Sequence, residues 1–87
     1  MEAQLSNMPN IGKVLATKLI EVGINTPEEL IVAGSENAFI RLKTVDSGAC
    51  LSKLCALEGA IQGIRWHNLN EARKAELKSF FSSLDKK

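Results

Sequence analysis

Apolar residues recur at three- and four-residue spacing along nearly the whole chain, in runs that are separated by helix start and stop signals. Such spacing places the apolar side chains on one face of each helix, and that face must be buried against another helix. The apolar residues are mainly Leu, Ile and Ala, with three Phe, one Trp and no Tyr, which favours packed helices over a sheet. The pattern therefore predicts an all-α fold.

The first clear run predicts a helix over residues 11–22. Asn10 can cap the start of this helix, and Gly23 is the expected left-handed stop, with Ile24 folding back onto the last turn. The apolar stripe of this helix is formed by Ile11, Val14, Leu15, Leu19 and Val22.

The strongest start signal lies at Thr26, where Glu29 follows three residues later and completes a capping box, with a proline at the first helical position. This signal predicts a helix over residues 27–33, which a glycine then ends. Ser35 directly offers a new cap for a further helix over residues 36–44. We therefore expect two short helices that meet at a corner.

Two longer helices complete the predicted fold of five helices. One runs over residues 49–64, and its wide apolar face is typical of a central helix. Two glycines in GxxxG spacing, the first at Gly59, are expected to allow close packing. The last helix runs over residues 69–84, with Asn68 as its cap and Glu71 three residues on. Its inward-facing residues are expected to be Ala72, Leu77, Phe80, Phe81 and Leu84.

The length and charge of the chain restrict its class further. With 87 residues there is too little volume for two independent cores, so we expect a single domain over residues 1–87. The formal net charge of +1 gives no overall field that would draw the chain onto a polyanion, so any nucleic-acid contact must be local. No apolar run approaches the roughly 20 residues that span a bilayer, and the start of the chain does not resemble a signal peptide. We therefore expect a cytoplasmic protein with no membrane partner.

The residues that catalysis and metal binding require are scarce. Cys50 and Cys55 are five residues apart on one predicted helix, so they point to different faces and are expected to be reduced core residues. His67 is the single imidazole, whereas a metal site needs several convergent ligands. A cysteine nucleophile paired with His67 is disfavoured, because both cysteines fall within the apolar stripe. The glutamates are expected on solvated helix faces. We therefore expect no enzyme, no cofactor, no metal and no small-molecule substrate.

One segment, residues 5–19, resembles a helix-hairpin-helix element, in which a tight hairpin precedes a helix. The residues that match its pattern are Met8, Pro9, Ile11, Gly12, Ala16 and Leu19. Such a hairpin leaves backbone N–H groups at a helix N-terminus, where the helix dipole favours a phosphate oxygen. Lys13 and Lys18 would add positive charge beside it.

Asn10 stands where the element usually has its first glycine, and its side chain is expected where a phosphate would approach closely, which would weaken binding. The alternative interpretation is that the hairpin is simply a tight connection whose Ile11 plugs the core. The near-neutral charge of the chain leaves both interpretations open.

The resemblance to known proteins extends over nearly the whole chain, from Leu5 to Leu84. The chain is similar to the C-terminal domain of the TfoX/Sxy family of bacterial competence regulators in the order of three segments, MPNIGKVLATKLIEVGINTPEEL, LSKLCALEGAIQGIRWHNL and EARKAEL. The most distinctive stretch is LEGAIQGIRWHNL, residues 57–69. In that family the domain follows an N-terminal α/β domain, and the resemblance implies a role in regulating genes of DNA uptake. This sequence lacks that domain, so it is either a stand-alone relative or an excised domain, and from the initial Met and the end at Lys87 we expect a complete short protein.

Arg65, Trp66 and His67 are expected in the turn between the last two helices. An aromatic ring that is flanked by cationic or polar groups can stack on a base or on a partner side chain. We favour the competing interpretation that Trp66 plugs the core and His67 orients the turn, because a lone Trp in a small domain is usually buried. A basic surface is better represented by Arg65, Arg73, Lys74 and Lys78, although solvated charge explains these residues equally well.

These observations favour a non-catalytic binding module of helix-hairpin-helix or SAM-like type, whose partner is DNA or a transcription-related protein. The candidate nucleic-acid-binding residues are Asn10, Ile11, Gly12, Lys13, Lys18 and Arg65. A few contacts to phosphates predict DNA binding that is weak and insensitive to sequence. The alternative is a protein-interaction or dimerisation module that exposes an apolar patch and binds no DNA. The sequence leaves the oligomeric state open.

Overall fold

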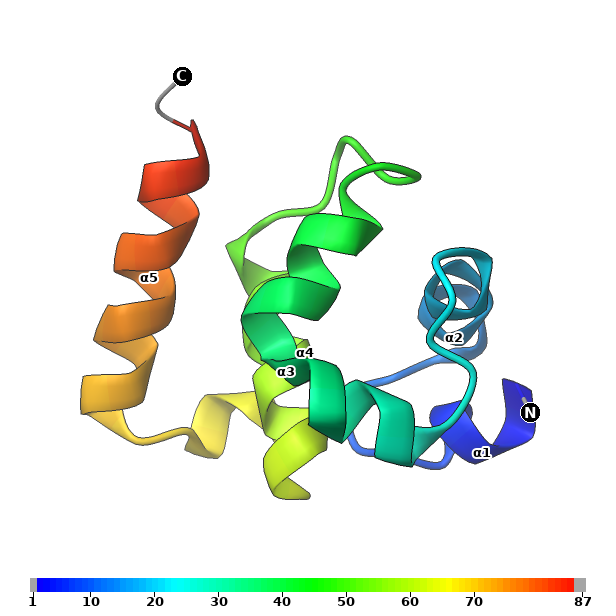
Figure 1. Ribbon diagram of the computed structural model, residues 1–87. Coiled ribbons are helices and arrows are strands. Elements are labelled where there is room, and N and C mark those ends of the chain that lie inside the picture. The colour runs from blue at the N-terminus through cyan, green and yellow to red at the C-terminus, as the bar shows by residue number, and fades with distance from the viewer. Residues whose placement is uncertain (1, 86–87) are drawn as a thin grey trace.

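The computed structural model describes residues 2–85, which contain five α-helices and one short 3-10 helix (Figure 1). They are α1 (Glu2–Ser6), α2 (Lys13–Glu21), α3 (Pro27–Leu42), α4 (Leu51–Gln62), η1 (Trp66–Asn68) and α5 (Glu71–Asp85). No strand occurs within this range, so the predicted all-α class is confirmed. None of the described helices combines the length and the apolar character that crossing a bilayer requires.

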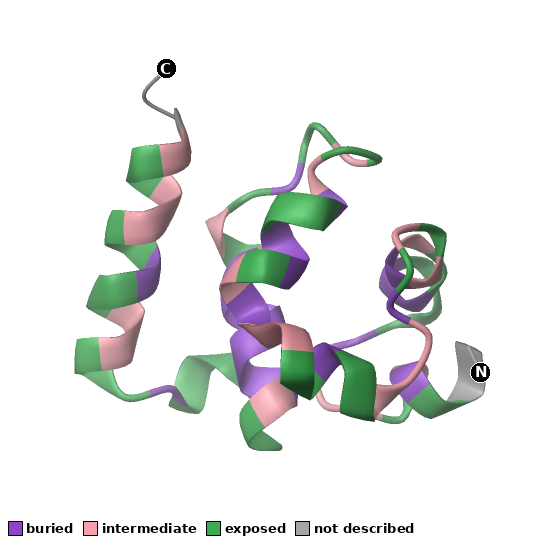
Figure 2. Cartoon of the chain, in the orientation of Figure 1, coloured by how far each residue is buried: buried purple, intermediate pink, exposed green. Residues whose placement is uncertain are grey.

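Helix α4 lies at the centre and contacts α3, η1 and α5, while α2 contacts α1 and α3. In Figure 1, α5 stands on one side of α3 and α4, and the pair of α1 and α2 stands on the other. Figure 2 shows buried residues concentrated on α4 and on the inward surfaces of its neighbours. Every residue of α4 from Leu54 to Ala60 is buried, so the prediction of a central helix is confirmed.

Helix α4 is shorter than the predicted 49–64. It ends at Gln62 because Gly63 takes a left-handed φ of 76°, and the N–H of Ile64 donates back to the Gly59 carbonyl over 2.9 Å. Gly59 allows close packing, as expected, because a Cβ at this position would lie 2.6 Å from Nδ2 of Asn10.

Helix α2 begins at Lys13, two residues later than predicted, and ends in the predicted way. Gly23 has a φ of 89°, and the N–H of the buried Ile24 donates to the Leu19 carbonyl over 2.9 Å. The predicted apolar stripe is wrong at Val14, which is 69% exposed. Val14 lies about 100° around the helix from Leu15, so it faces away from the core that Leu15 and Leu19 contact.

A kink divides α3 where two helices were predicted. Thr26 caps the start as expected, since its Oγ1 accepts the N–H of Glu29 over 3.1 Å. Gly34 interrupts the helical backbone with a φ of 82° and a ψ of 158°, and the helix resumes directly after it. The expectation that Ser35 caps the second part is wrong, because its hydroxyl instead donates to the carboxylate of Glu58 over 2.7 Å.

The short helix α1 is missing from the sequence prediction. A run of five residues carries too little of an apolar stripe to indicate a helix, and a helix of this length is unstable alone in water. Leu5 is completely buried, and burying one leucine side chain contributes about 1.5–3 kcal/mol. Packing against α2 therefore stabilises α1.

Helix α5 begins two residues later than predicted. Asn70 rather than Asn68 caps it, because Oδ1 of Asn70 accepts the N–H of Ala72 over 2.7 Å. The prediction that Ala72 faces inward is wrong, since it is exposed. The other inward-facing residues are confirmed as buried or partly buried, namely Leu77, Phe80, Phe81 and Leu84.

A charged cluster joins α5 to α3 and α4. Glu58 is only 8% exposed, and its carboxylate accepts hydrogen bonds from Arg73 (3.0 Å), Ser35 and Gln62. Burial raises the pKa of Glu58, but the hydrogen bonds outweigh it and hold the pKa below its ordinary value. The prediction of solvated glutamates is therefore wrong for Glu58. Arg73 is not a free surface cation, because it also pairs with two further glutamates.

Candidate nucleic-acid interface

A tight hairpin at residues 7–12 joins α1 to α2. The N–H of Met8 donates to the Leu5 carbonyl over 3.0 Å, and the N–H of Ile11 donates to the Met8 carbonyl over 3.3 Å. The Ile11 side chain is buried in the core. Both the side chain and the amide of Ile11 therefore serve the fold, and the amides that can face a ligand begin at Gly12.

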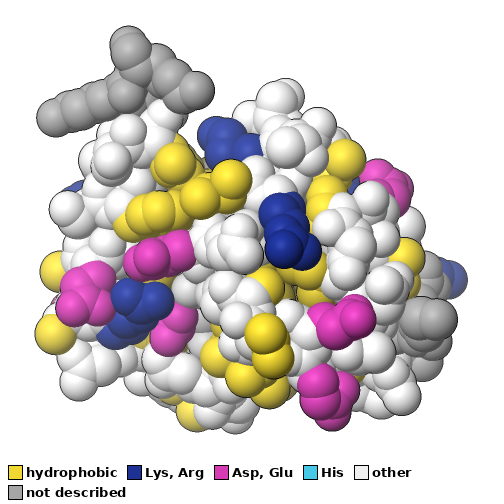
Figure 3. Space-filling view, viewed as in Figure 1, with side chains coloured by type: hydrophobic (Ala, Val, Ile, Leu, Met, Phe, Trp, Pro, Cys, Tyr) yellow, Lys and Arg dark blue, Asp and Glu magenta, His cyan; other side chains and the backbone are white. Residues whose placement is uncertain are grey.

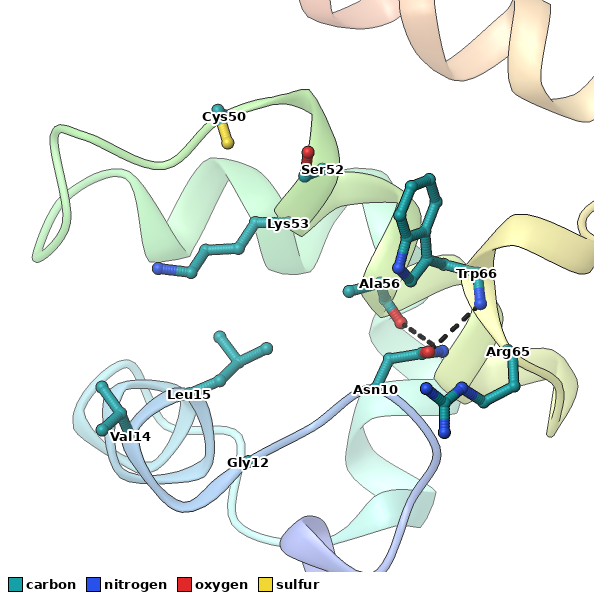
Figure 4. Close-up of a pocket in the computed structure, with 10 residues that line it drawn as sticks. All are labelled: Asn10, Gly12, Val14, Leu15, Cys50, Ser52, Lys53, Ala56, Arg65 and Trp66. Carbon is teal, nitrogen blue, oxygen red and sulfur yellow. Dashed lines mark hydrogen bonds between the residues drawn. The ribbon is translucent and has the colours of Figure 1, made fainter.

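The side chain of Asn10 turns into the protein (Figure 4). Its Nδ2 donates to the Ile64 carbonyl over 2.9 Å, and its Oδ1 accepts the N–H of Trp66 over 3.1 Å. The backbone of Asn10 is left-handed, with a φ of 70°, as at the glycine that it replaces. The predictions that Asn10 caps α2 and that its side chain lies in the path of a phosphate are therefore wrong, because this side chain joins the hairpin to the end of α4.

Gly12 occupies the N-cap position of α2 and provides no side-chain cap. Its backbone is ordinary extended chain, with a φ of −89°, and a Cβ would meet no atom within 4 Å. The fold therefore does not require glycine here. What the missing side chain leaves is open access to the first N–H groups of α2, where the helix dipole is positive.

The three predicted cations differ in their surroundings. Lys13 is exposed directly after Gly12. Lys18 forms an ion pair with Asp46 at 3.2 Å, so its charge is already partly compensated. Arg65 is exposed and has no ion-pair partner among the described residues.

A groove of about 520 Å³ lies between the hairpin and the start of α4. Figure 4 shows the ten residues that line it, among them Asn10, Gly12, Lys53, Arg65 and Trp66. The structure thus brings Arg65 and the hairpin together on one surface. Lys13 lies at the next position after Gly12, outside this lining, and shares a smaller hollow with Lys18 on α2.

Trp66 does not plug the core, contrary to the interpretation favoured from the sequence. It is 40% exposed and stands at the rim of the groove (Figure 4). Gly63 ends α4, so Trp66 falls in a short connection that the core does not enclose. The signal that could have indicated this was the glycine itself, which is a frequent helix stop.

The two cysteines differ from each other. Both thiols are free, but Cys50 is exposed and Cys55 is buried, so the prediction of a core position is wrong for Cys50. Because α4 begins at Leu51, Cys50 occupies the N-cap position, where the backbone N–H groups of Lys53 and Ser52 lower the pKa of its thiol. Burial raises the pKa of Cys55. Within residues 2–85 no group of three or more His, Cys, Asp or Glu side chains is placed to hold a metal ion.

Comparison with known families matches residues 1–81 to the TfoX C-terminal domain. A curated relative, Protein Sxy of Escherichia coli (strain K12), is 36% identical over 84 residues, which is 97% of this chain. The chain spans 40% of the length of that relative.

Two crystal structures of Listeria monocytogenes proteins of uncharacterised function have the same fold. One, in a triclinic form, is 58% identical with a TM-score of 0.92, and the match covers 94% of this chain and 93% of that one. The other, in a tetragonal form, is 59% identical with a TM-score of 0.87, and the match covers 91% of this chain and 98% of that one.

Proposed function

Because this chain belongs to the TfoX C-terminal domain family, we propose that it is a non-catalytic binding module whose helical hairpin contacts the sugar-phosphate backbone of DNA. The observation that carries the proposal is the uncapped, exposed start of α2 at Gly12, with the exposed Lys13 beside it. A role in regulating genes of DNA uptake, which the family resemblance implies, would place this module beside DNA in the cytoplasm.

The chemistry of the contact follows from the start of α2. The N–H groups of its first turn lack partners within the helix, and together with the helix dipole they favour a phosphate oxygen. Lys13 adds one charge that attracts phosphate without reading bases. Since the formal net charge is +1, affinity must come from these few contacts. We expect a dissociation constant of about 1–100 µM at physiological salt, typical of non-specific binding.

A pair of charge-reversed variants tests this proposal. Lys13→Glu should weaken the binding of a labelled duplex, measured by fluorescence anisotropy, on every sequence alike, and should reduce the salt slope by about one. Lys78→Glu is the matched control, because Lys78 is exposed on α5, far from α2 in Figure 1, and the substitution changes the net charge equally. Equal loss of affinity in both variants would assign the binding to net charge and contradict the proposed site.

Amide chemical shifts test the location independently. On addition of duplex at low salt, the amide chemical shifts of Gly12 and Lys13 should change, whereas those of α5 should not. If the amides near Gly12 do not move, the DNA proposal fails.

A second candidate function, protein interaction, is favoured by two exposed apolar residues on α3. Val32 is 87% exposed and Ile31 is 52% exposed. Figure 3 shows hydrophobic side chains in separate patches among charges of both signs, a surface that suits a protein partner as well as it suits weak DNA contact. Sedimentation velocity at high protein concentration tests dimerisation, which Val32→Asp should abolish while leaving DNA binding unchanged.

A further inference from the structure

Trp66 is a large aromatic side chain that the fold leaves unused. The three phenylalanines are buried or partly buried, and the Phe39 and Phe81 rings pack together with their centroids 5.9 Å apart. Trp66 instead contacts the exposed His67 ring edge to face, with centroids 5.6 Å apart. In Figure 4 its ring rises at the rim of the groove, above Ala56.

The fold holds Trp66 in a fixed relation to the hairpin. Its backbone N–H donates to Oδ1 of Asn10, and its Cα would lie 3.1 Å from a Cβ on Gly59. The backbone of Trp66 is therefore joined to the hairpin that presents the start of α2. A volume of about 520 Å³ is in the range of ligand sites, and it is sufficient for one nucleotide.

The charge of the groove favours an anionic occupant. Its charged lining residues, Lys53 and Arg65, are both cations. Lys53 is paired with Asp46 at 2.8 Å, so Arg65 is the cation that remains available to a ligand. In Figure 4 the Trp66 ring rises at one side of the connection after α4, and the Arg65 side chain extends to the other side, towards the hairpin. An exposed aromatic ring and a cation that line one groove can bind a nucleobase and its phosphate.

We propose that Trp66 stacks on an unpaired base of a single-stranded nucleic acid, while Arg65 contacts the adjoining phosphate. This inference rests on the proposed function and names its substrate class. In a duplex the bases are stacked inside and present no free face to Trp66, apart from the ends of the helix. The domain should therefore prefer a single strand over the duplex of the same sequence.

The single tryptophan makes the test direct. The chain has one Trp and no Tyr, so tryptophan fluorescence reports on Trp66 alone. A short oligothymidylate should quench this fluorescence, and a duplex of matched length should leave it nearly unchanged. An abasic strand with the same number of phosphates should bind roughly 5- to 150-fold more weakly than oligothymidylate, which is the effect of losing one stacked base.

Substitutions at Trp66 test whether its ring causes the preference for a strand that carries bases. By anisotropy of a labelled strand, Trp66→Leu should abolish the difference between oligothymidylate and the abasic strand, and Trp66→Phe should retain most of it. Ile40→Ala is the matched control, because it trims an exposed apolar residue outside the groove and should change neither affinity. Circular dichroism of each variant checks folding, and Trp66→Phe keeps the test valid if Trp66→Leu unfolds.

Three outcomes would overturn the inference. Equal affinity of the wild-type protein for oligothymidylate and the abasic strand would show that no base is stacked. If Lys13→Glu still weakens duplex binding in that case, the proposed contact with the DNA backbone stands and only the stacking by Trp66 is refuted. Quenching by polyglutamate that equals quenching by oligothymidylate would show a groove for acidic peptides. Absence of binding to every nucleic acid at low salt would overturn the proposed function together with the stacking.

Discussion

Asn10 is the residue on which the geometry of the candidate interface depends most, and replacing it by Gly or by Ala separates its two roles. The first role is conformational, because the hairpin needs a left-handed residue at φ 70°. The second is the joining of the hairpin to the chain after α4, through the Ile64 carbonyl and the Trp66 N–H. Glycine satisfies the first role and loses the second, whereas alanine loses both.

The magnitudes follow from these contacts. Each of the two hydrogen bonds contributes about 0.5–1.5 kcal/mol to the free energy of unfolding. The longer contact of 3.5 Å to the Ala56 carbonyl adds little. Asn10→Gly should therefore destabilise the protein by about 1–2 kcal/mol, after the relief of left-handed strain is subtracted. Asn10→Ala should destabilise it by about 2–3 kcal/mol, because it loses the same hydrogen bonds, gains no relief of left-handed strain, and lacks the polar side chain that lets asparagine tolerate this backbone.

Urea unfolding followed by far-UV circular dichroism measures both variants. The expected order of stability is wild type, then Asn10→Gly, then Asn10→Ala, with unchanged m-values. The reasoning is refuted if Asn10→Ala is as stable as Asn10→Gly, since the left-handed backbone would then impose no constraint. It is also refuted if Asn10→Gly matches the wild type, because the side-chain hydrogen bonds would then contribute nothing.

Three further predictions concern other parts of the fold. Gly59→Ala should destabilise the protein by about 1–3 kcal/mol in urea unfolding, because the new Cβ meets the Asn10 side chain and backbone atoms. A Cβ at Gly12 meets no atom within 4 Å, so Gly12→Ala should stay within about 0.5 kcal/mol of the wild type. The pKa of Glu58 is lowered in the folded state, so its contribution to stability is present above the ordinary carboxyl pKa of about 4.3 and is lost as the pH falls through the folded pKa. Glu58→Gln should therefore weaken the fall in the free energy of unfolding at acid pH, and an unchanged fall would contradict this assignment. Iodoacetamide should alkylate Cys50 faster than Cys55 in the folded protein, and at similar rates in urea, as measured by peptide mass spectrometry; earlier labelling of Cys55 would contradict the burial.

The helix signals that the sequence predicts correctly are local ones. The hydroxyl of Thr26 accepts the N–H of Glu29, the Glu29 carboxylate accepts the N–H of Asn25, and Gly23 needs only its own φ to end a helix. Such signals act between neighbours in the chain, so they can be identified without knowledge of the fold. Helix α1 lacks them, because its stability comes from burying Leu5 against a helix that follows later in the chain.

The candidate interface was predictable only in part. The hairpin pattern indicated free backbone N–H groups at a helix start beside Lys13, but not whether the hairpin faces solvent; in the structure Gly12 and Lys13 are both exposed. The other half of the groove depended on the bounds of α4, which were predicted two residues too long at each end. That difference moves Cys50 from the apolar stripe to the N-cap position, and it leaves Trp66 well outside the helix rather than directly after it.

Helix α4 also explains why Glu58 was assigned to the surface. An apolar stripe in the sequence indicates a helix with one buried side. The residues from Leu54 to Ala60 are all buried, so α4 has no solvent-facing side along that stretch. Ala56 and Gly59 share the face that meets the hairpin, while Glu58 points roughly 100° away, towards α3 and α5. A polar residue in a helix that is enclosed on every side must find partners inside the protein. Glu58 finds them in a buried hydroxyl and an arginine, and one central helix thereby joins the hairpin and α5 through separate faces.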